Sequence, residues 1–184
     1  MRHFLDTIRI YDFNGYYHLF SLNQNNHFYG DLFYFFARYG IVFFFFSFTY
    51  LIWKKKINAF FCTFLAMGIA GLVDFLITTI WRRPSPFVSH SDLVSPVIVN
   101  LRVDPNVSFP SSHTYIAFAI AISVFLYGHR KLGTALFALA ILVAVSRVGA
   151  GLHYPSDVIG GAVLGLVSGI IAFFIVKKAE KNWR

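Results

Sequence analysis

Residues 32–53 read LFYFFARYGIVFFFFSFTYLIW, and Arg38 is the one charged side chain in this run of 22. A helix of this length reaches about 33 Å, enough to cross the roughly 30 Å hydrocarbon core of a bilayer. Four further apolar runs follow along the chain: Ile57–Trp81, Thr114–Tyr127, Leu132–Val145 and Pro155–Val176. The pattern predicts an all-α fold, a polytopic membrane helical bundle with about five transmembrane helices.

The composition of the 184 residues supports a lipid environment. Hydrophobic residues make up 57% of the chain and charged residues 13%, with a mean hydropathy of +0.62. A soluble domain carries about 25% charged residues, so this chain has too few to cover a surface that faces water. The net charge is +8, but the basic residues lie between apolar runs, so topology and a phosphate ligand explain them better than nucleic acid does. The single cysteine, Cys62, excludes an intrachain disulfide or a cysteine-based metal site.

We interpret residues 1–184 as a single domain. Residues 1–31 mix polar and aromatic side chains and are expected to form amphipathic helices at the membrane interface. Residues 32–176 are expected to form the transmembrane bundle, with residues 82–112 as an ordered outer loop. Residues 177–184 are expected to form a basic cytoplasmic tail.

Lysine placement predicts how the bundle is oriented. Three basic clusters fall on one side of a five-helix arrangement: Lys54–Lys56, Arg130–Lys131, and the group Lys177, Lys178, Lys181 and Arg184. Loops rich in lysine and arginine stay in the cytoplasm, so this side is expected to be cytoplasmic. The opposite side carries arginines and no lysine near the helices: Arg82, Arg83, Arg102 and Arg147. We therefore expect a protein of the plasma or inner membrane whose arginine-bearing side faces the periplasm or the cell exterior.

The third and fourth apolar runs are short. About 15 helical residues cover roughly 23 Å, which is less than the thickness of the hydrocarbon core. If basic residues hold the cytoplasmic ends of these helices, their outer ends lie below the outer surface. The polar residues at those ends, Ser112–His113 and Ser146–Arg147, are then expected at the depth of lipid headgroups.

Residues 146–157, SRVGAGLHYPSD, combine groups that bind and attack a phosphate. His153 and Asp157 lie one helical turn apart, so the carboxylate is expected to hold one imidazole N–H and leave the other ring nitrogen as a nucleophile or base. Arg147 offers a planar pair of donors that matches phosphate oxygens. Gly149 and Gly151 are expected to let the backbone between them turn tightly.

Residues 109–113, FPSSH, precede the third apolar run. Ser111 or Ser112 is suited to cap a helix start, and the free amides of that first turn favour an anion. Taken alone, the segment is adequately explained as a helix cap. A cap does not explain His113, because an apolar residue would be less costly there. A second histidine can protonate a leaving oxygen as a general acid.

The carboxylates are too scattered to suggest a metal site. Asp92 and Asp104 are isolated loop residues, so we expect phosphoryl transfer without a metal or another cofactor. Asp74 lies inside the second apolar run, where a carboxylate is a functional candidate by default. Two interpretations of Asp74 remain: it pairs with an arginine of the site, or it holds a helix–helix hydrogen bond, and we favour the second.

The last two motifs, Phe-Pro-Ser-x-His and Ser-Arg-x5-His-x3-Asp, resemble those of the type 2 phosphatidic-acid phosphatases, the membrane relatives of the vanadium haloperoxidases. Within that family, the order of motifs resembles the bacterial undecaprenyl-diphosphate phosphatases of the bacitracin-resistance type. The resemblance covers most of the chain, from about Leu32 to Val176. It implies that His153 is the nucleophile and forms a phosphohistidine, with Asp157 orienting it.

The same resemblance implies how the substrate is held and protonated. His113 would be the acid for the leaving group and afterwards the base for water. Arg147 would bind the phosphate together with the amides around Ser111 and Ser112.

The first motif departs from the usual form of the family. Residues 81–87 read WRRPSPF, whereas the family pattern is Lys-x6-Arg-Pro. With Arg83 in the arginine position, Leu76 takes the lysine position; with Ser85 there instead, a threonine does. Neither register supplies the lysine, so we expect Arg83, and Arg82 beside it, to bind the substrate phosphate and supply the missing charge.

Three functions are compatible with these patterns. The leading hypothesis is metal-independent hydrolysis of a lipid phosphate or diphosphate, with undecaprenyl diphosphate converted to undecaprenyl phosphate. The alternative enzyme acts on phosphatidic acid, phosphatidylglycerophosphate or lipid A. A non-catalytic lipid-phosphate binder or transporter is disfavoured by the pair of His153 and Asp157, because binding needs arginines but no oriented imidazole. The expected partners are the lipid substrate and the bilayer; the sequence does not predict an oligomeric state.

Overall fold

The computed structural model describes residues 2–91 and 104–182, with the backbone alone for residues 2–8. Its helices are α1 (Arg2–Asn25), α2 (His27–Trp53), α3 (Ile57–Ile80), α4 (Pro86–Ser89), α5 (Ser112–Leu126), α6 (Arg130–Gly149) and α7 (Pro155–Asn182). All regular secondary structure in these two stretches is helical, which confirms the all-α prediction. Asp92, Arg102 and Arg184 lie outside the described residues.

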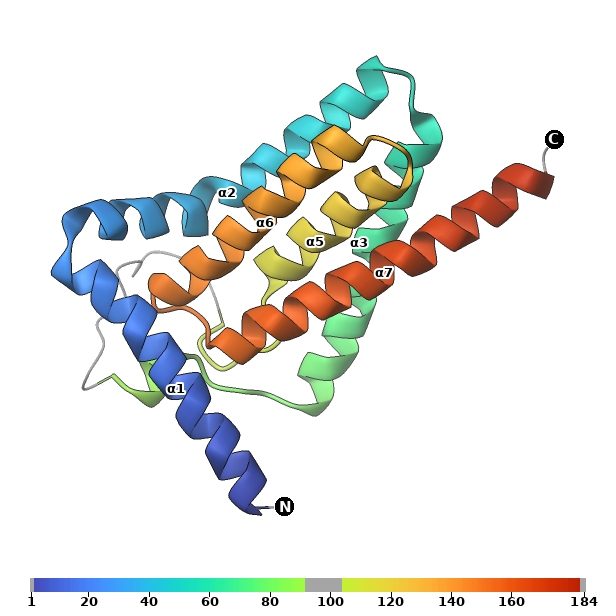
Figure 1. Cartoon of the computed structure of the whole chain (residues 1–184). Helices are drawn as coiled ribbons and strands as arrows, with labels where there is room; N and C mark the ends of the chain where they lie inside the picture. The colour runs from blue at the N-terminus through green and yellow to red at the C-terminus, as the bar shows by residue number, and fades with distance from the viewer. Residues whose placement is uncertain (1, 92–103, 183–184) are drawn as a thin grey trace.

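Four of the helices, α2, α3, α6 and α7, are long and apolar enough to cross a membrane. The 15-residue α5 is shorter, and it lies in the centre of the bundle beside α3, α6 and α7 (Figure 1). Ala117, Ala119 and Ala121 of α5 are fully buried. Because protein surrounds α5, this helix does not need to match the thickness of the hydrocarbon core. The predicted set of five is therefore four long helices and one short central helix.

The fourth predicted span is longer than the sequence indicated. We expected Leu132–Val145, but α6 runs over 20 residues, from Arg130 to Gly149. Arg147 remains helical because its Nη1 donates to the carbonyl oxygen of Ala37 in α2, at 3.2 Å. The prediction of a short fourth span was wrong, so the argument for a site at headgroup depth rests on the short α5 alone.

The described part of the predicted N-terminal segment, residues 2–31, holds one long helix, α1, and the first residues of α2, which begins at His27 rather than at the expected Leu32. Helix α1 runs across the end of the bundle where α6 ends and α7 begins (Figure 1). Tyr16 and Phe20 are buried there against Val148 and Tyr154. Tyr17, which is next to Tyr16 in the chain, is half exposed. This helix therefore belongs to the wall of the bundle at that end.

A stripe of glycines brings α7 close to α5. A Cβ atom on Gly161 would lie 2.8 Å from the carbonyl oxygen of Ser111, and Cβ atoms on Gly165 and Gly169 would clash with α5 in the same way. Small residues four apart let helix backbones approach closely inside a membrane, where packing rather than water exclusion holds helices together. The start of α5 is therefore held against the start of α7.

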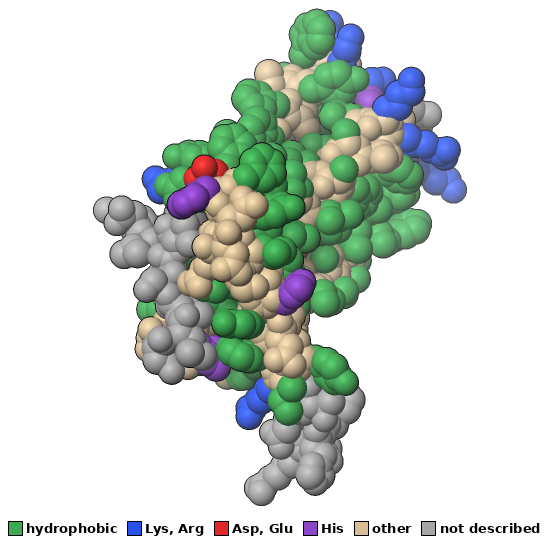
Figure 2. Space-filling view, turned by 60° about the vertical axis from the view of Figure 1, so that its left-hand side comes forward, with side chains coloured by type: hydrophobic (Ala, Val, Ile, Leu, Met, Phe, Trp, Pro, Cys, Tyr) green, Lys and Arg blue, Asp and Glu red, His purple; other side chains and the backbone are tan. Residues whose placement is uncertain are grey.

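Charged and apolar side chains divide the surface. Apolar side chains cover the sides of the bundle in Figure 2, and the basic side chains gather mainly at one end. The half- or fully exposed apolar residues include Phe45, Phe46, Phe61, Phe64 and Phe174, as expected of helices in lipid. The described residues of the three predicted basic clusters lie at the end of α2, the start of α6 and the end of α7, at the end of the bundle opposite to α1.

Candidate active site

The polar motifs meet where α6 ends and α7 and α5 begin. Gly151 has a φ of +85° and allows the chain to leave α6, while the amide of Leu152 donates to the carbonyl of Arg147 at 3.1 Å. The prediction of a tight turn holds for Gly151 but not for Gly149, which is still helical and packs closely on the ring of Phe33.

His153 is buried in this turn, and its two neighbours fix its tautomer. Its Nδ1 lies 2.8 Å from the carbonyl oxygen of Ser108, and its Nε2 lies 3.1 Å from Nη2 of Arg147. A carbonyl oxygen can only accept and a guanidinium can only donate. Nδ1 therefore carries the proton and donates to the carbonyl of Ser108, and the lone pair of the unprotonated Nε2 accepts from Nη2 of Arg147. Burial, together with the charge of Arg147, lowers the pKa of His153, so the ring is neutral at neutral pH.

Asp157 does not hold the imidazole directly, contrary to our expectation. Its Oδ2 lies 3.7 Å from Nδ1 of His153, which is too far for a hydrogen bond. The hydroxyl of Ser108 donates to that same oxygen at 2.5 Å, and the amide of Tyr154 donates to it at 2.8 Å. Ser108 therefore bridges the pair, since its carbonyl holds His153 and its hydroxyl holds Asp157. We did not identify Ser108 from the sequence, where only its place just before FPSSH marks it.

Arg147 is almost fully buried, with 1% of its surface exposed. One of its terminal nitrogens donates to Ala37 and the other faces His153, as described above. Its Nε has no hydrogen-bond partner among the described residues. A buried donor without a partner is uncommon in proteins, and this one lies beside an unprotonated imidazole, where it can donate to an anion. The guanidinium is therefore arranged to receive an anion next to Nε2 of His153.

Arg83 lies between two carboxylates. Its Nη1 donates to Oδ1 of Asp157 at 2.7 Å and to the hydroxyl of Ser156 at 2.6 Å, and its Nη2 donates to Asp12 at 2.5 Å. Its guanidinium carbon also stands 4.1 Å from the ring centroid of Tyr154. We expected this arginine to bind the substrate phosphate, but here its donors hold protein groups. In this position it orients Asp157.

Asp12 of α1 completes this network, and sequence reasoning missed it. It is 6% exposed and accepts from the amide of Ser156 at 2.8 Å and from the Ser156 hydroxyl at 2.6 Å, besides Arg83. One signal was available: Asp12, Tyr16 and Phe20 are four residues apart, so they share one helical face. A carboxylate on the apolar face of an amphipathic helix indicates a buried partner.

The other two residues of the first motif lie apart from this network. Arg82 is exposed and forms no ion pair with the described residues. Ser85 is buried, and its amide donates to the carbonyl of Pro105 at 2.9 Å. The structure therefore brings Arg83, but not Arg82, to the other site residues.

The start of α5 contributes amides and a second histidine. The amide of Ser111 donates to the carbonyl of Asp157 at 3.1 Å, so it is already in use. The amides of Ser112 and His113 have no backbone partner among the described residues and stay free for an anion. His113 is half-buried and within range of electrostatic interaction with both Arg147 and His153, so the three side chains lie near one another.

Two expectations about carboxylates can be compared with the structure. In the described stretches, no three His, Cys, Asp or Glu side chains gather as a metal site would require, and a metal-independent reaction remains a prediction. Asp74 accepts a hydrogen bond from the hydroxyl of Tyr115 in α5, at 3.2 Å. This contact matches the helix–helix interpretation of Asp74 that we favoured.

Residues 59–181 match the family model described as the PAP2 superfamily. Two curated relatives illustrate the range of that similarity. The undecaprenyl-diphosphatase BcrC of Bacillus subtilis is 41% identical over 107 residues, which cover 58% of this chain and 52% of the relative. The lipid A 4'-phosphatase of Bacteroides thetaiotaomicron is 37% identical over 98 residues, which cover 52% of this chain and 43% of the relative. The chain thus spans about half the length of these relatives.

A solved structure shares the arrangement of the whole bundle. The crystal structure of LpxE from Aquifex aeolicus superposes with a TM-score of 0.67 at 28% identity. The superposition covers 84% of this chain and 92% of the other. With its apolar helices, this likeness makes the chain a multi-pass membrane protein.

Proposed function

Because the chain belongs to the PAP2 superfamily, we propose that it is a membrane lipid phosphatase that hydrolyses undecaprenyl diphosphate to undecaprenyl phosphate and inorganic phosphate. The choice of lipid rests on the similarity to a relative named undecaprenyl-diphosphatase and on the order of motifs. The choice of reaction rests on the side chains themselves.

One observation carries the proposal: the unprotonated Nε2 of His153 lies directly against a donor of Arg147. Nδ1 is occupied by the carbonyl of Ser108, so only Nε2 can attack, and Nη2 of Arg147 is 3.1 Å from it. A site that only binds a phosphate has no need of a neutral imidazole with a fixed tautomer. Nucleophilic catalysis needs one.

In the first step, Nη2 of Arg147 donates to a phosphate oxygen instead of to Nε2 of His153, and the released Nε2 attacks the terminal phosphorus and forms a phosphorus–nitrogen bond. The bond from that phosphorus to the bridging oxygen breaks, and its electron pair stays on the oxygen of undecaprenyl phosphate. His113 gives a proton to that oxygen; its imidazole takes up this proton only when the negative charge of the bound diphosphate offsets burial and the charge of Arg147. The unpaired Nε–H of Arg147 and the free amides at the start of α5 stabilise the charge on the transferred group, where phosphoryl transfer needs it most.

In the second step, His113, now neutral, accepts a proton from a water molecule as the water oxygen attacks the phosphorus. The phosphorus–nitrogen bond breaks, its electron pair returns to His153, and inorganic phosphate leaves. The ring of His153 carries positive charge between the two steps. Asp157 stabilises that charge, and Ser108 and Arg83 hold the carboxylate in position.

We also propose that this site faces the periplasm or the cell exterior. The lysines at the ends of α2 and α7 and at the start of α6 lie at the opposite end of the bundle. Segments of this kind remain in the cytoplasm. A lipid diphosphate would then reach the site from the outer leaflet.

The decisive experiment is release of phosphate by the purified chain in detergent, with chelator present, from a panel of lipids. The panel contains undecaprenyl diphosphate, phosphatidic acid, phosphatidylglycerophosphate and lipid A, and the His153→Ala protein is the blank. We expect the highest kcat/KM for undecaprenyl diphosphate. If lipid A leads instead, the relative named lipid A 4'-phosphatase is the better guide to the substrate. If the folded chain binds these lipids but releases phosphate from none, it is a binder and the enzymatic proposal fails.

A further inference from the structure

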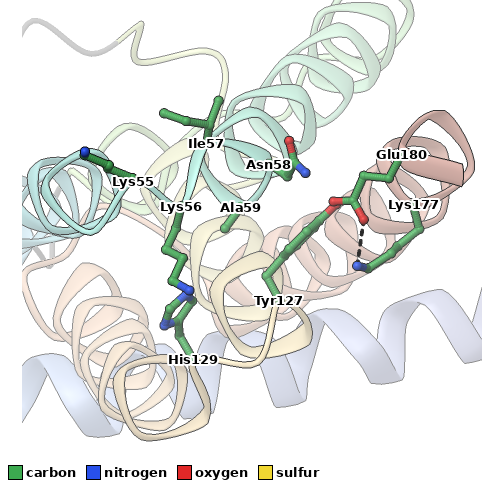
Figure 3. Close-up of a pocket in the computed structure, with 9 residues that line it drawn as sticks. All are labelled: Lys55, Lys56, Ile57, Asn58, Ala59, Tyr127, His129, Lys177 and Glu180. Carbon is green, nitrogen blue, oxygen red and sulfur yellow. Dashed lines mark hydrogen bonds and ion pairs between the residues drawn. The ribbon is translucent and has the colours of Figure 1, made fainter. Parts of the chain in front are cut away.

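A cavity of about 320 Å³ opens at the lysine end of the bundle, where the turn between α2 and α3 meets the turn between α5 and α6 and the end of α7 (Figure 3). It is lined by Lys55, Lys56, Ile57, Asn58, Ala59, Tyr127, His129, Lys177 and Glu180. Along α6, Arg147 lies 17 residues, or roughly 26 Å, from Arg130 at this end of the bundle. The cavity is therefore not part of the site described above.

The cavity carries more positive than negative charge. Lys177 is neutralised by Glu180, at 2.8 Å. Lys56 points instead toward His129 (Figure 3), and neither Lys55 nor Lys56 forms an ion pair with the described residues. Lysines without carboxylate partners around a concave space favour an anion.

Lys55 is held in a backbone conformation that favours glycine. Its φ is +53°, the one positive φ of a residue other than glycine among the described residues. The amide of Lys56 bonds to the carbonyl of Leu51 at 2.8 Å, as in a helix that ends with a glycine in this position. A positive charge that only orients the helices in the membrane does not require a strained backbone at position 55, since Lys54 and Lys56 supply the same charge without such strain. The strained residue adds a further ammonium group to the lining of the cavity.

The side of α3 next to the cavity is apolar and open to lipid. Ile57 lines the cavity and is 46% exposed, and Phe61, one turn further along α3, is 58% exposed. An anion seated among the lysines would thus stand above a surface suited to an acyl chain. A phosphodiester attached to two acyl chains fits both features, whereas a soluble anion fits only the first.

We propose that this cavity binds the phosphate of an anionic phospholipid from the leaflet at the lysine end, at a second lipid site apart from the active site. Lys55 and Lys56 hold the phosphate, and the acyl chains lie along Ile57 and Phe61. Basic pockets between membrane helices bind such headgroups in other proteins.

The test is a titration of the full-length protein in neutral detergent with phosphatidylglycerol, followed by the shift in its thermal unfolding midpoint. Phosphatidylcholine and inorganic phosphate are titrated in parallel. We expect phosphatidylglycerol alone to raise the midpoint, and Lys56→Gln to weaken its apparent Kd roughly tenfold, as loss of a charge-assisted contact does. Lys131→Gln removes the same charge at the same end but outside the cavity, and should change the Kd less than about twofold.

Lys55→Gly gives a second, independent readout. Glycine relieves the backbone at position 55, so the lipid-free protein should unfold at a higher temperature than wild type while its Kd for phosphatidylglycerol rises. If Lys55→Gly raised the unfolding midpoint equally with and without phosphatidylglycerol, the proposal would be overturned. It would also be overturned if Lys56→Gln and Lys131→Gln weakened the binding of phosphatidylglycerol equally. Displacement of phosphatidylglycerol by millimolar inorganic phosphate would overturn the lipid assignment in favour of a soluble anion.

Discussion

Asp12→Asn is the substitution that tests the network behind His153 most directly. It keeps the shape of the side chain but removes its charge and turns one acceptor into a donor that faces the donors of Arg83 and Ser156. Arg83 then retains Asp157 as its single carboxylate. The positive charge of the guanidinium, no longer balanced by Asp12, acts against the positive charge that develops on His153 during the reaction.

The size of the effect follows from the geometry. The chain of contacts from Asp12 through Arg83 and Asp157 places Asp12 about 10 Å from the imidazole, and a unit charge at that distance is worth about 1.7 kcal/mol at an effective dielectric constant of about 20. That energy corresponds to roughly a fifteenfold lower kcat. KM should not rise, because Asp12 does not face the substrate. The free energy of unfolding should fall by about 2–3 kcal/mol, since a mostly buried ion pair is broken.

The assay is phosphate release with the preferred lipid, analysed as separate kcat and KM values, with thermal unfolding measured in the same detergent. Asp31→Asn is the matched control, because it removes the same charge from an exposed position and should leave kcat within about twofold. Asp12→Glu keeps the charge and should recover most of the loss. If folded Asp12→Asn turns over as fast as wild type, Asp12 only anchors α1 and the electrostatic reasoning is refuted.

His153→Ala is expected to abolish turnover, and rapid quenching of the wild type without acid should trap labelled phosphate on a histidine; more than a few percent residual activity in folded protein would exclude His153 as the nucleophile. Arg83→Ala should lower kcat about ten- to a hundredfold because Asp157 loses its partner, whereas Arg82→Ala should keep a kcat near wild type because the Arg82 side chain is exposed. If both variants lost kcat equally, both arginines would be assigned to phosphate binding. Activity should survive EDTA, and vanadate should inhibit by mimicking the transition state; rescue of a chelated, inactive protein by magnesium would contradict this. In a cysteine-free background, a cysteine at Asn106 should react with an impermeant reagent outside intact cells and one at Lys131 should not; the reverse pattern would invert the proposed topology.

The long helices could be predicted because their apolar runs match the thickness of a bilayer. The second span ends within one residue of the expected position, at Ile80. The errors occur where polar residues remain helical inside the bundle. We ended the fourth span at Val145 because Ser146 and Arg147 are polar, but a carbonyl of α2 and the packing of the bundle keep them helical. Nothing in the local sequence reveals that acceptor.

The candidate site could be predicted in its members but not in its connections. His113, Arg147, His153 and Asp157 come together as the motif spacing indicated. The spacing of four suggested a direct bond from Asp157 to His153, but the turn before α7 rotates the ring toward Ser108 instead. Backbone acceptors of this kind carry no signature in residue type.

The role of Arg83 shows a further limit of motif reasoning. A missing lysine suggested that this arginine must replace its charge at the phosphate, because only charges within the motif were considered. The carboxylate that balances the charge of Arg83 belongs to Asp12, which lies 71 residues away in α1 and outside the segment that matches the family. Partners so far apart in the chain are recognised only when the fold is known.

The glycine stripe of α7 bears on how the protein tolerates change far from its reacting groups. Because α7 packs closely on α5 at Gly161, Gly165 and Gly169, the two helices resist sliding along each other. The relative position of their first turns therefore depends on all three contacts. Gly169 lies about 18 Å along α7 from Asp157. A methyl group at Gly169 would push the axes of α5 and α7 apart and tilt α7. That tilt would displace Asp157. A screen for inactive variants would thus recover substitutions at the depth of the lipid tails that displace the site residues without replacing any of them.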